Sequence, residues 1–176
     1  MSNFSTYLSP SKARLLPVNS RERSIASHSL RQAWHYIFDY CPTLLAMYPP
    51  SGKEFLDVFL DKIEAANISL NWKVFFIILD DHKKAGTLTE DLCAELMMAA
   101  AIRWTISDLT KAQSIFIVEK NFGHSILGEK AAGIDDDKTF KVILHDNIDS
   151  TNDLFFSVST SRLAEDHSNW EVLNYD

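Results

Sequence analysis

The sequence predicts an α+β fold: a single domain in which a mostly antiparallel sheet of four to five strands packs with about three helices, preceded by a mobile basic N-terminal arm. Three observations lead to this prediction. Apolar residues recur at helical spacing early in the chain, the most hydrophobic run lies near its middle, and short apolar stretches between polar loops fill its second half. The expected domains are a flexible basic arm, residues 1–24, and a globular domain, residues 25–176.

Two helices are predicted before the hydrophobic run. Residues 27–40 place apolar side chains at helical spacing on one face. A second helix is expected over residues 51–66, because Ser51 and Glu54 have the spacing of a capping box, which satisfies free amides at a helix start. The apolar positions of this second helix cover more than one side, so we expect it to be largely buried.

The hydrophobic run is interpreted as the central strand, over about residues 69–79. Successive side chains of a strand point to opposite faces, so a strand that is buried on both faces is apolar at every position. In this run one face would carry Val74, Phe76 and Ile78, and the other would carry Phe75, Ile77 and Leu79. A third helix is predicted from a second capping box, Thr87 and Glu90, to Trp104.

The remaining strands are predicted in the second half of the chain. They cover residues 114–120, 140–145 and 154–160, and the tail at 169–175 is either a fifth strand or a free end. Residues 121–138 are interpreted as a long polar loop, because they contain three of the five glycines of the chain and a run of acidic residues.

Charge is distributed unevenly along the chain. The net charge is −7, but the charges are not evenly spread. Residues 1–35 carry five basic residues and one acidic residue, whereas residues 36–176 carry twelve basic and twenty-three acidic residues. A basic arm on an acidic body indicates that the arm meets something anionic, either a phosphate surface or an acidic face of a neighbouring copy. The alternative interpretation is a solvated, disordered terminus.

The composition favours an intracellular, cytoplasmic protein. The N-terminus lacks the apolar segment of a signal peptide, and no apolar run is long enough for a transmembrane helix. Two cysteines, Cys41 and Cys93, do not make a disulfide framework.

No catalytic motif stands out, so we expect a protein that is not an enzyme and has no cofactor or metal. The histidines lack the spacing of a zinc helix, and the chain has no phosphate-binding or dinucleotide-binding glycine pattern. Cys41 and Cys93 lie on predicted apolar helix faces, where a thiol is inert. The run Asp135–Asp137 could hold a divalent cation, which makes a small metal-dependent enzyme a third alternative, but a solvated acidic turn is favoured.

The segment 73–123 resembles the core of a rhabdovirus matrix protein. The shared pattern is an aromatic-rich strand, a polar loop, a helix ending near tryptophan and an apolar strand ending near glycine: Val74–Leu79, Thr87–Leu92, Ala101–Trp104, Ile115–Val118 and Gly123. The resemblance covers under a third of the chain and is a pattern of residue classes. It implies a mobile basic arm ahead of an α+β domain. The chain departs from the family in lacking the P-P-x-Y motif and in having an acidic body.

The resemblance implies a self-associating structural protein of the virion that links nucleocapsid and membrane through arm-mediated oligomerisation. Contacts with a neighbouring copy or an anionic membrane surface would then involve the arm residues Phe4, Tyr7, Lys12, Arg14, Leu15, Leu16, Arg21 and Arg23. The alternative is a bacterial immunity or antitoxin-type protein whose acidic body blocks a basic protein partner.

The tail offers a second candidate contact. Trp170 and Leu173 follow acidic residues in a short pattern that can add a strand to another sheet. The alternative is a tail that packs on its own domain.

Overall fold

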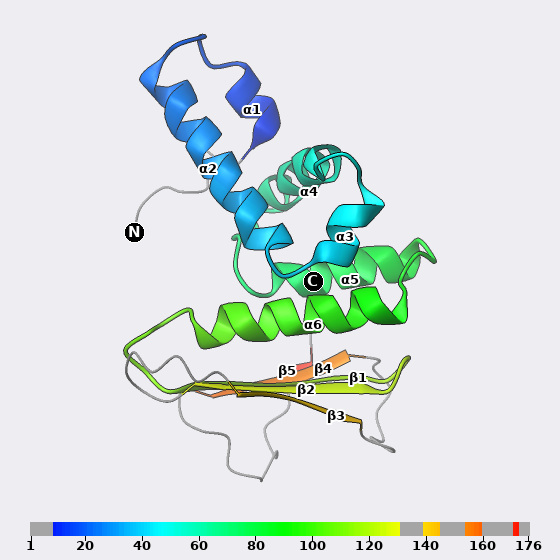
Figure 1. Ribbon diagram of the computed structural model, residues 1–176. Coiled ribbons are helices and arrows are strands. Elements are labelled where there is room, and N and C mark those ends of the chain that lie inside the picture. The colour runs from blue at the N-terminus through cyan, green and yellow to red at the C-terminus, as the bar shows by residue number, and fades with distance from the viewer. Residues whose placement is uncertain (1–8, 131–138, 145–153, 160–170, 173–176) are drawn as a thin grey trace. The chain divides into compact units, whose positions relative to one another are not determined.

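The computed structural model describes residues 9–130, 139–144, 154–159 and 171–172, which belong to two compact units, Met1–Lys73 and Val74–Asp176. The described part of the first unit is helical, whereas the second combines two helices with a sheet (Figure 1).

The described part of the first unit forms four helices: α1 (Pro10–Arg14), α2 (Arg21–Phe38), α3 (Pro42–Met47) and α4 (Lys53–Ala65). Two begin with proline, whose fixed backbone angle suits the first position of a helix. α2 is capped by Ser20, whose hydroxyl accepts a hydrogen bond from the Arg23 amide at 3.0 Å. α4 has no side-chain cap and instead follows Gly52, which adopts a left-handed φ of 66°.

Aromatic rings form much of the core of this unit. Phe55 stacks on Phe59 at 5.7 Å between ring centroids and on Tyr48 at 4.7 Å. The edge of Phe38, from α2, meets Phe55 at 6.1 Å. These contacts tie α2, the turn after α3, and α4 into one core.

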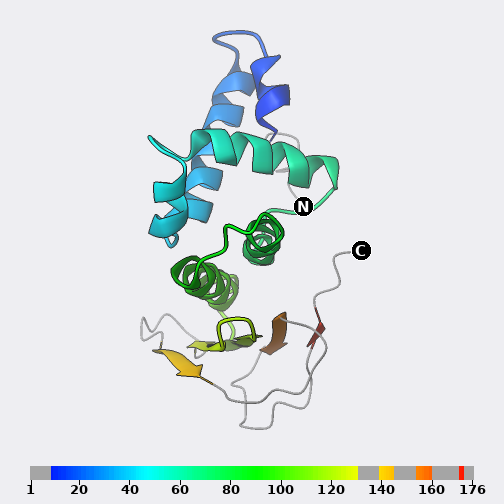
Figure 2. The same ribbon diagram turned by 90° about the vertical axis from the view of Figure 1, so that its right-hand side faces the viewer.

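The second unit places two helices on an antiparallel sheet. The helices are α5 (Val74–Lys84) and α6 (Glu90–Thr105), and the strands are β1 (Gln113–Glu119), β2 (His124–Lys130), β3 (Thr139–Leu144), β4 (Leu154–Ser159) and β5 (Glu171–Val172). The strand order is β3-β2-β1-β4-β5. α6 runs along one face of the sheet, and the view along α5 and α6 shows them side by side (Figure 2).

Three strands, β2, β1 and β4, form the part of the sheet whose side chains are described. Ile117 of β1 lies opposite Ile126 of β2 and Phe156 of β4, so these three buried residues share one face. Phe156 stacks on Phe76 of α5 at 5.7 Å, which identifies this face as the one that packs against the helices.

The predicted central strand, residues 69–79, is wrong because this segment forms the helix α5. An unbroken apolar run has no periodicity that separates a buried strand from a buried helix. Five of the first six residues of α5 are buried: Val74, Phe75, Phe76, Ile78 and Leu79. Burial around most of the helix explains why both alternating sets of side chains are apolar.

The predicted fold class is also wrong in its balance of elements, because the described residues form six helices rather than about three. α1 and α3 span five and six residues, too few to show a helical period. Conversely, β2 lies in residues 121–138, which the sequence analysis interpreted as a loop.

The boundary predicted at residue 24 falls within α2. Residues 1–8 lie outside the described residues, whereas residues 9–20 contain α1 and the loop that follows it. The mobility of residues 1–24 stays a prediction.

Candidate functional site

β1 is the central strand of the sheet, and its last residue, Glu119, has a buried carboxylate. Glu119 is 1% exposed and accepts hydrogen bonds from the amides of Asn121 and Phe122 at 2.7 and 2.9 Å. These bonds fix the turn into β2, in which Gly123 adopts a left-handed φ of 73°. The carboxylate of Glu119 therefore has a structural role in positioning β1 and β2.

Cys93 of α6 lies near this carboxylate in the core. Burial raises the pKa of its thiol far above the ordinary value, and the charge of Glu119 and a hydrogen bond to it raise the pKa further. A thiol held in its protonated form is a poor nucleophile and a poor metal ligand. The prediction that Cys41 and Cys93 are buried core residues is confirmed.

His124, at the start of β2, is the third titratable group in this region. Its side chain is 11% exposed, and its Nε2 atom lies 3.7 Å from the Glu90 Oε1 atom without a hydrogen bond. Within the described ranges, no group of three or more His, Cys, Asp or Glu residues is arranged to hold a metal ion. Residues 135–137, the acidic run of the sequence analysis, lie outside those ranges.

The outer edge of β4 is the feature best suited to binding. β4 pairs with β1 over its whole length, but on its other side β5 covers only Phe155 and Phe156. Among the described residues, no strand pairs with that side of residues 157–159. The strand sequence Leu-Phe-Phe-Ser-Val-Ser contains no charged residue and no proline, the devices that usually protect an edge.

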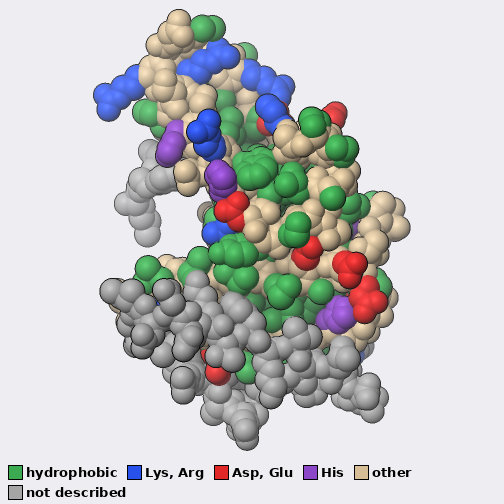
Figure 3. Space-filling view, in the orientation of Figure 1, with side chains coloured by type: hydrophobic (Ala, Val, Ile, Leu, Met, Phe, Trp, Pro, Cys, Tyr) green, Lys and Arg blue, Asp and Glu red, His purple; other side chains and the backbone are tan. Residues whose placement is uncertain are grey.

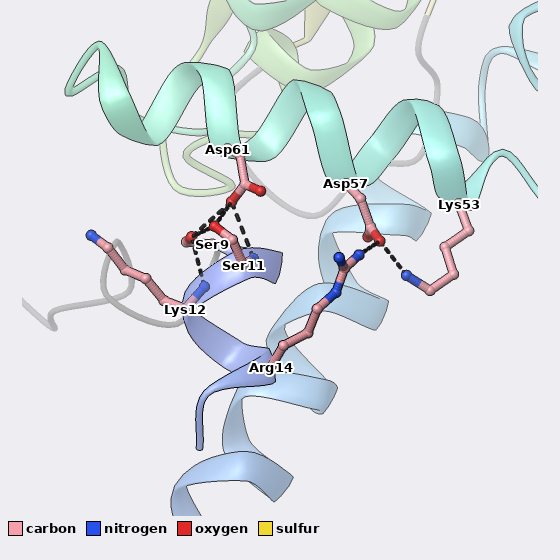
Figure 4. Close-up of polar contacts among 7 residues, drawn as sticks. All are labelled: Ser9, Ser11, Lys12, Arg14, Lys53, Asp57 and Asp61. Carbon is pink, nitrogen blue, oxygen red and sulfur yellow. Dashed lines mark hydrogen bonds and ion pairs between the residues drawn. The ribbon is translucent and has the colours of Figure 1, made fainter.

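Two of the cationic residues assigned to the arm are bound to α4 instead. Lys12 forms an ion pair with Glu64, and Arg14 lies 2.5 Å from the Asp57 carboxylate, which also binds Lys53. Arg14 and Lys53 meet at Asp57 in Figure 4. These contacts attach α1 to α4.

A third carboxylate of α4 completes this attachment. The hydroxyls of Ser9 and Ser11 both donate to Asp61, at 2.7 and 2.9 Å (Figure 4). Burial raises the pKa of Asp61, but the hydrogen bonds from the two serines outweigh it and hold the pKa below its ordinary value. The sequence contained a signal for this acidic face, since its carboxylates recur at helical spacing within the predicted helix 51–66.

The other predicted contact residues are distributed differently. Leu15 is 85% exposed, Arg21 is exposed, and the Leu16 carbonyl accepts a hydrogen bond from Arg23. The remaining predicted contacts lie outside the described residues: Phe4, Tyr7, Trp170 and Leu173.

Comparison with protein families gives one match. The family described as methanobactin biosynthesis cassette protein MbnC-like matches residues 13–174. No curated protein matches the sequence.

This match corrects several predictions. The resemblance to rhabdovirus matrix proteins is wrong, because it rested on residue classes in a short segment, whereas the family match covers nearly the whole chain. The viral structural function, the virion localisation and the antitoxin alternative therefore have no support. The expectation that the chain is not an enzyme is not confirmed either, because a biosynthesis family can include enzymes.

No helix in the described part of the chain is long and apolar enough to cross a membrane.

The match over residues 13–174 establishes that the chain belongs to the MbnC-like family of methanobactin biosynthesis cassette proteins.

Proposed function

We propose that this chain takes part in methanobactin biosynthesis as a binding component, which holds an extended peptide segment of another protein as an added strand beside β4. The family match supports the biological setting. The observation that carries the binding mode is the partly covered, uncharged outer edge of β4. Extended peptides bind such edges through main-chain hydrogen bonds, and alternate side chains then provide specificity.

The geometry of β4 suits an added strand. Its pairing with β1 extends to Ser159, so the backbone of residues 157–159 is held in an extended conformation before any partner binds. Each hydrogen bond formed with the partner contributes about 0.5–1.5 kcal/mol net. Because the segment is short, we expect specificity to require side-chain contacts in addition to backbone pairing.

Successive residues of an antiparallel strand direct their amides to opposite neighbours. Ser157 and Ser159 therefore face one side of β4, and Val158 faces the other. Proline at a residue that faces β1 breaks the existing ladder, whereas proline at a residue that faces outward removes only a donor to the added strand. The three single proline variants thus provide their own matched controls.

The test combines these variants with hydrogen exchange. The full chain is mixed with each of the other proteins of a methanobactin biosynthesis cassette, purified singly. We expect one of them to protect the amides of residues 157–159, and we expect the proline variants that keep wild-type stability to bind this protein more weakly. Unchanged exchange at β4 with every cassette protein, or wild-type binding by a stable proline variant, would refute strand addition.

A further inference from the structure

α1 is attached to the first unit mainly by charged and polar side chains. Of its five residues only Pro10 is buried, and the residue that caps it, Ser9, is buried as well. The side chains of Lys12 and Arg14 are 58% and 67% exposed, although both form ion pairs. The apolar surface that α1 buries is therefore small, and its attachment is largely electrostatic.

The acceptors of these contacts form a row along α4. Asp57, Asp61 and Glu64 follow one another at intervals of four and three residues, so they lie on one face of the helix. We call these three carboxylates the acidic row. Figure 4 shows the groups that bind its first two members, and Lys12 binds the third: Arg14 and Lys53 at Asp57, Ser9 and Ser11 at Asp61, and Lys12 at Glu64.

α1 is too short to be a stable helix without these contacts. An isolated helix of fewer than about 12–15 residues is marginal in water, and α1 has five residues. The amides of Ala13, Leu15 and Leu16 donate to the carbonyls of Ser9, Lys12 and Ala13, respectively. Because these bonds exist only while the segment is helical, loss of the contacts with the acidic row would also release these three amides.

α2 and α4 have supports of their own. The hydroxyl of Ser20 caps α2 by accepting a hydrogen bond from the Arg23 amide. α4 is held by the stacked rings of Phe55 and Phe59 and by the contact of Phe55 with Phe38 of α2. α1 can therefore open locally while α2 and α4 stay folded, as weakly anchored segments do in native proteins.

Opening of α1 would change the charge of the α4 surface. Lys and Arg side chains gather over α1 and α2 in the space-filling view (Figure 3). With α1 in place, Lys12 and Arg14 neutralise part of the acidic row. With α1 detached, Lys53 is the only cation of α4 among those that bind the row, so the same face becomes acidic.

We propose that α1 is a releasable strap, which closes on the acidic row at low ionic strength and detaches from it as the ionic strength rises, while α2 and α4 stay folded. Exposed ion pairs are weak and are screened by salt, whose Debye length falls from about 10 Å at 0.1 M to about 3 Å at 1 M. Once the two ion pairs of α1 are screened, the serine contacts with Asp61 are its main remaining polar attachment. Closed, the strap is an internal ligand of the acidic row; open, it leaves the row to other cationic groups. This inference concerns the first unit alone and does not rest on the proposed function.

The test is amide hydrogen exchange of the full chain, followed by nuclear magnetic resonance at about 20 mM and about 500 mM NaCl. We expect high salt to speed exchange of the Ala13, Leu15 and Leu16 amides by about three- to tenfold, the factor expected when two exposed ion pairs are screened. The Leu56 amide of α4 and the Ser24 amide of α2, which bond within or next to their own helices, provide the reference and should not change.

Variants of the acidic row separate the strap from a general effect of salt. Glu64→Gln removes one ion pair, so it should speed exchange of the three α1 amides at low salt and reduce the further effect of high salt. Asp61→Asn removes the charge that the two serines bind and should speed exchange at both salt concentrations. The matched control is Asp80→Asn, which breaks an exposed ion pair with Lys84 inside α5 and should leave α1 unchanged.

A charge reversal tests the pairing itself. Lys12→Glu should speed exchange in α1, and adding Glu64→Lys should slow it again, because the pair is restored with its signs exchanged. Exchange in α1 that responds neither to salt nor to Glu64→Gln would overturn the proposal. Equal acceleration in α1, α2 and α4 would also overturn it, since the unit would then open as a whole.

Discussion

Replacing Gly52 with alanine is expected to destabilise the helical unit, because this residue has a left-handed backbone and lies against an aromatic ring. Its φ is 66°, and a Cβ atom there would lie 2.5 Å from Cζ and 2.8 Å from Cε2 of Phe38. The left-handed conformation costs a residue with a side chain about 1–2 kcal/mol. Forcing the Phe38 ring to move adds about 1–3 kcal/mol, because overpacking a core strains its neighbours.

Gly86 provides a matched control. Its φ is 68°, but a Cβ atom there would meet nothing within 4 Å, so Gly86→Ala carries only the backbone cost. The free energy of unfolding, measured by urea denaturation and circular dichroism, should therefore fall by about 2–5 kcal/mol for Gly52→Ala and by about 1–2 kcal/mol for Gly86→Ala.

A double-mutant cycle tests the cause directly. Phe38→Leu removes the ring atoms that the new Cβ atom would meet, so Gly52→Ala should cost less in that background than in the wild type. Equal costs in both backgrounds, or equal effects of the two glycine substitutions, would show that the ring does not constrain this position.

The remaining predictions concern the polar contacts and the thiols. Asp61→Asn should lower stability at neutral pH. Because the folded pKa of Asp61 is depressed, its contribution is present above the unfolded pKa and is lost as the pH falls through the folded pKa, so the difference from the wild type should shrink in acid-range unfolding experiments. Arg14→Ala should change the unfolding free energy by only about 0–1 kcal/mol, because the arginine is largely exposed. Glu119→Ala should cost about 1–3 kcal/mol, since it leaves two amides of the β1–β2 turn without their acceptor. Cys41 and Cys93 should react with a thiol reagent only on unfolding, and rapid labelling of the folded chain would contradict their burial.

Segments with clear periodicity or capping signals were predictable from the sequence. The helices α2 and α4, the helix α6 predicted after a capping box at Thr87 and Glu90, and the strand β1 all overlap their predicted ranges. Thr89 rather than Thr87 caps α6, and its hydroxyl accepts a hydrogen bond from the Leu92 amide. Such elements are identifiable because local chemistry and tertiary burial favour the same conformation.

The predictions for other segments were wrong, because their conformation depends on contacts with residues that are distant in the sequence. The run 74–79 forms part of the helix α5, and it is buried around most of the helix. Its residues are therefore apolar on every side, and they show no helical period that would distinguish them from a buried strand. The strand β2 contains Gly128 and polar residues that are typical of loops, and pairing with β1 and β3 overrides that preference. The basic residues Lys12 and Arg14 were assigned to a mobile arm because their acidic partners lie more than 40 positions away in the sequence.

The candidate site was the least predictable part. The outer edge of β4 depends on strand order, which a single sequence does not reveal. Leu15 was among the predicted contact residues and is exposed, but the attachment of its neighbour Arg14 to Asp57 of α4 joins residues 43 positions apart, and a single sequence does not reveal such a pair.

Methanobactin production is the most direct test of the central claim, that this chain acts in the pathway through the edge of β4. The gene for this chain is deleted from a strain that carries the cassette and is replaced either by the wild-type gene or by a stable proline variant at residues 157–159. We predict that the wild-type gene restores production and that the variant restores little or none. Full production with the variant would contradict the proposed role of β4, and full production without any copy of the chain would contradict its role in the pathway.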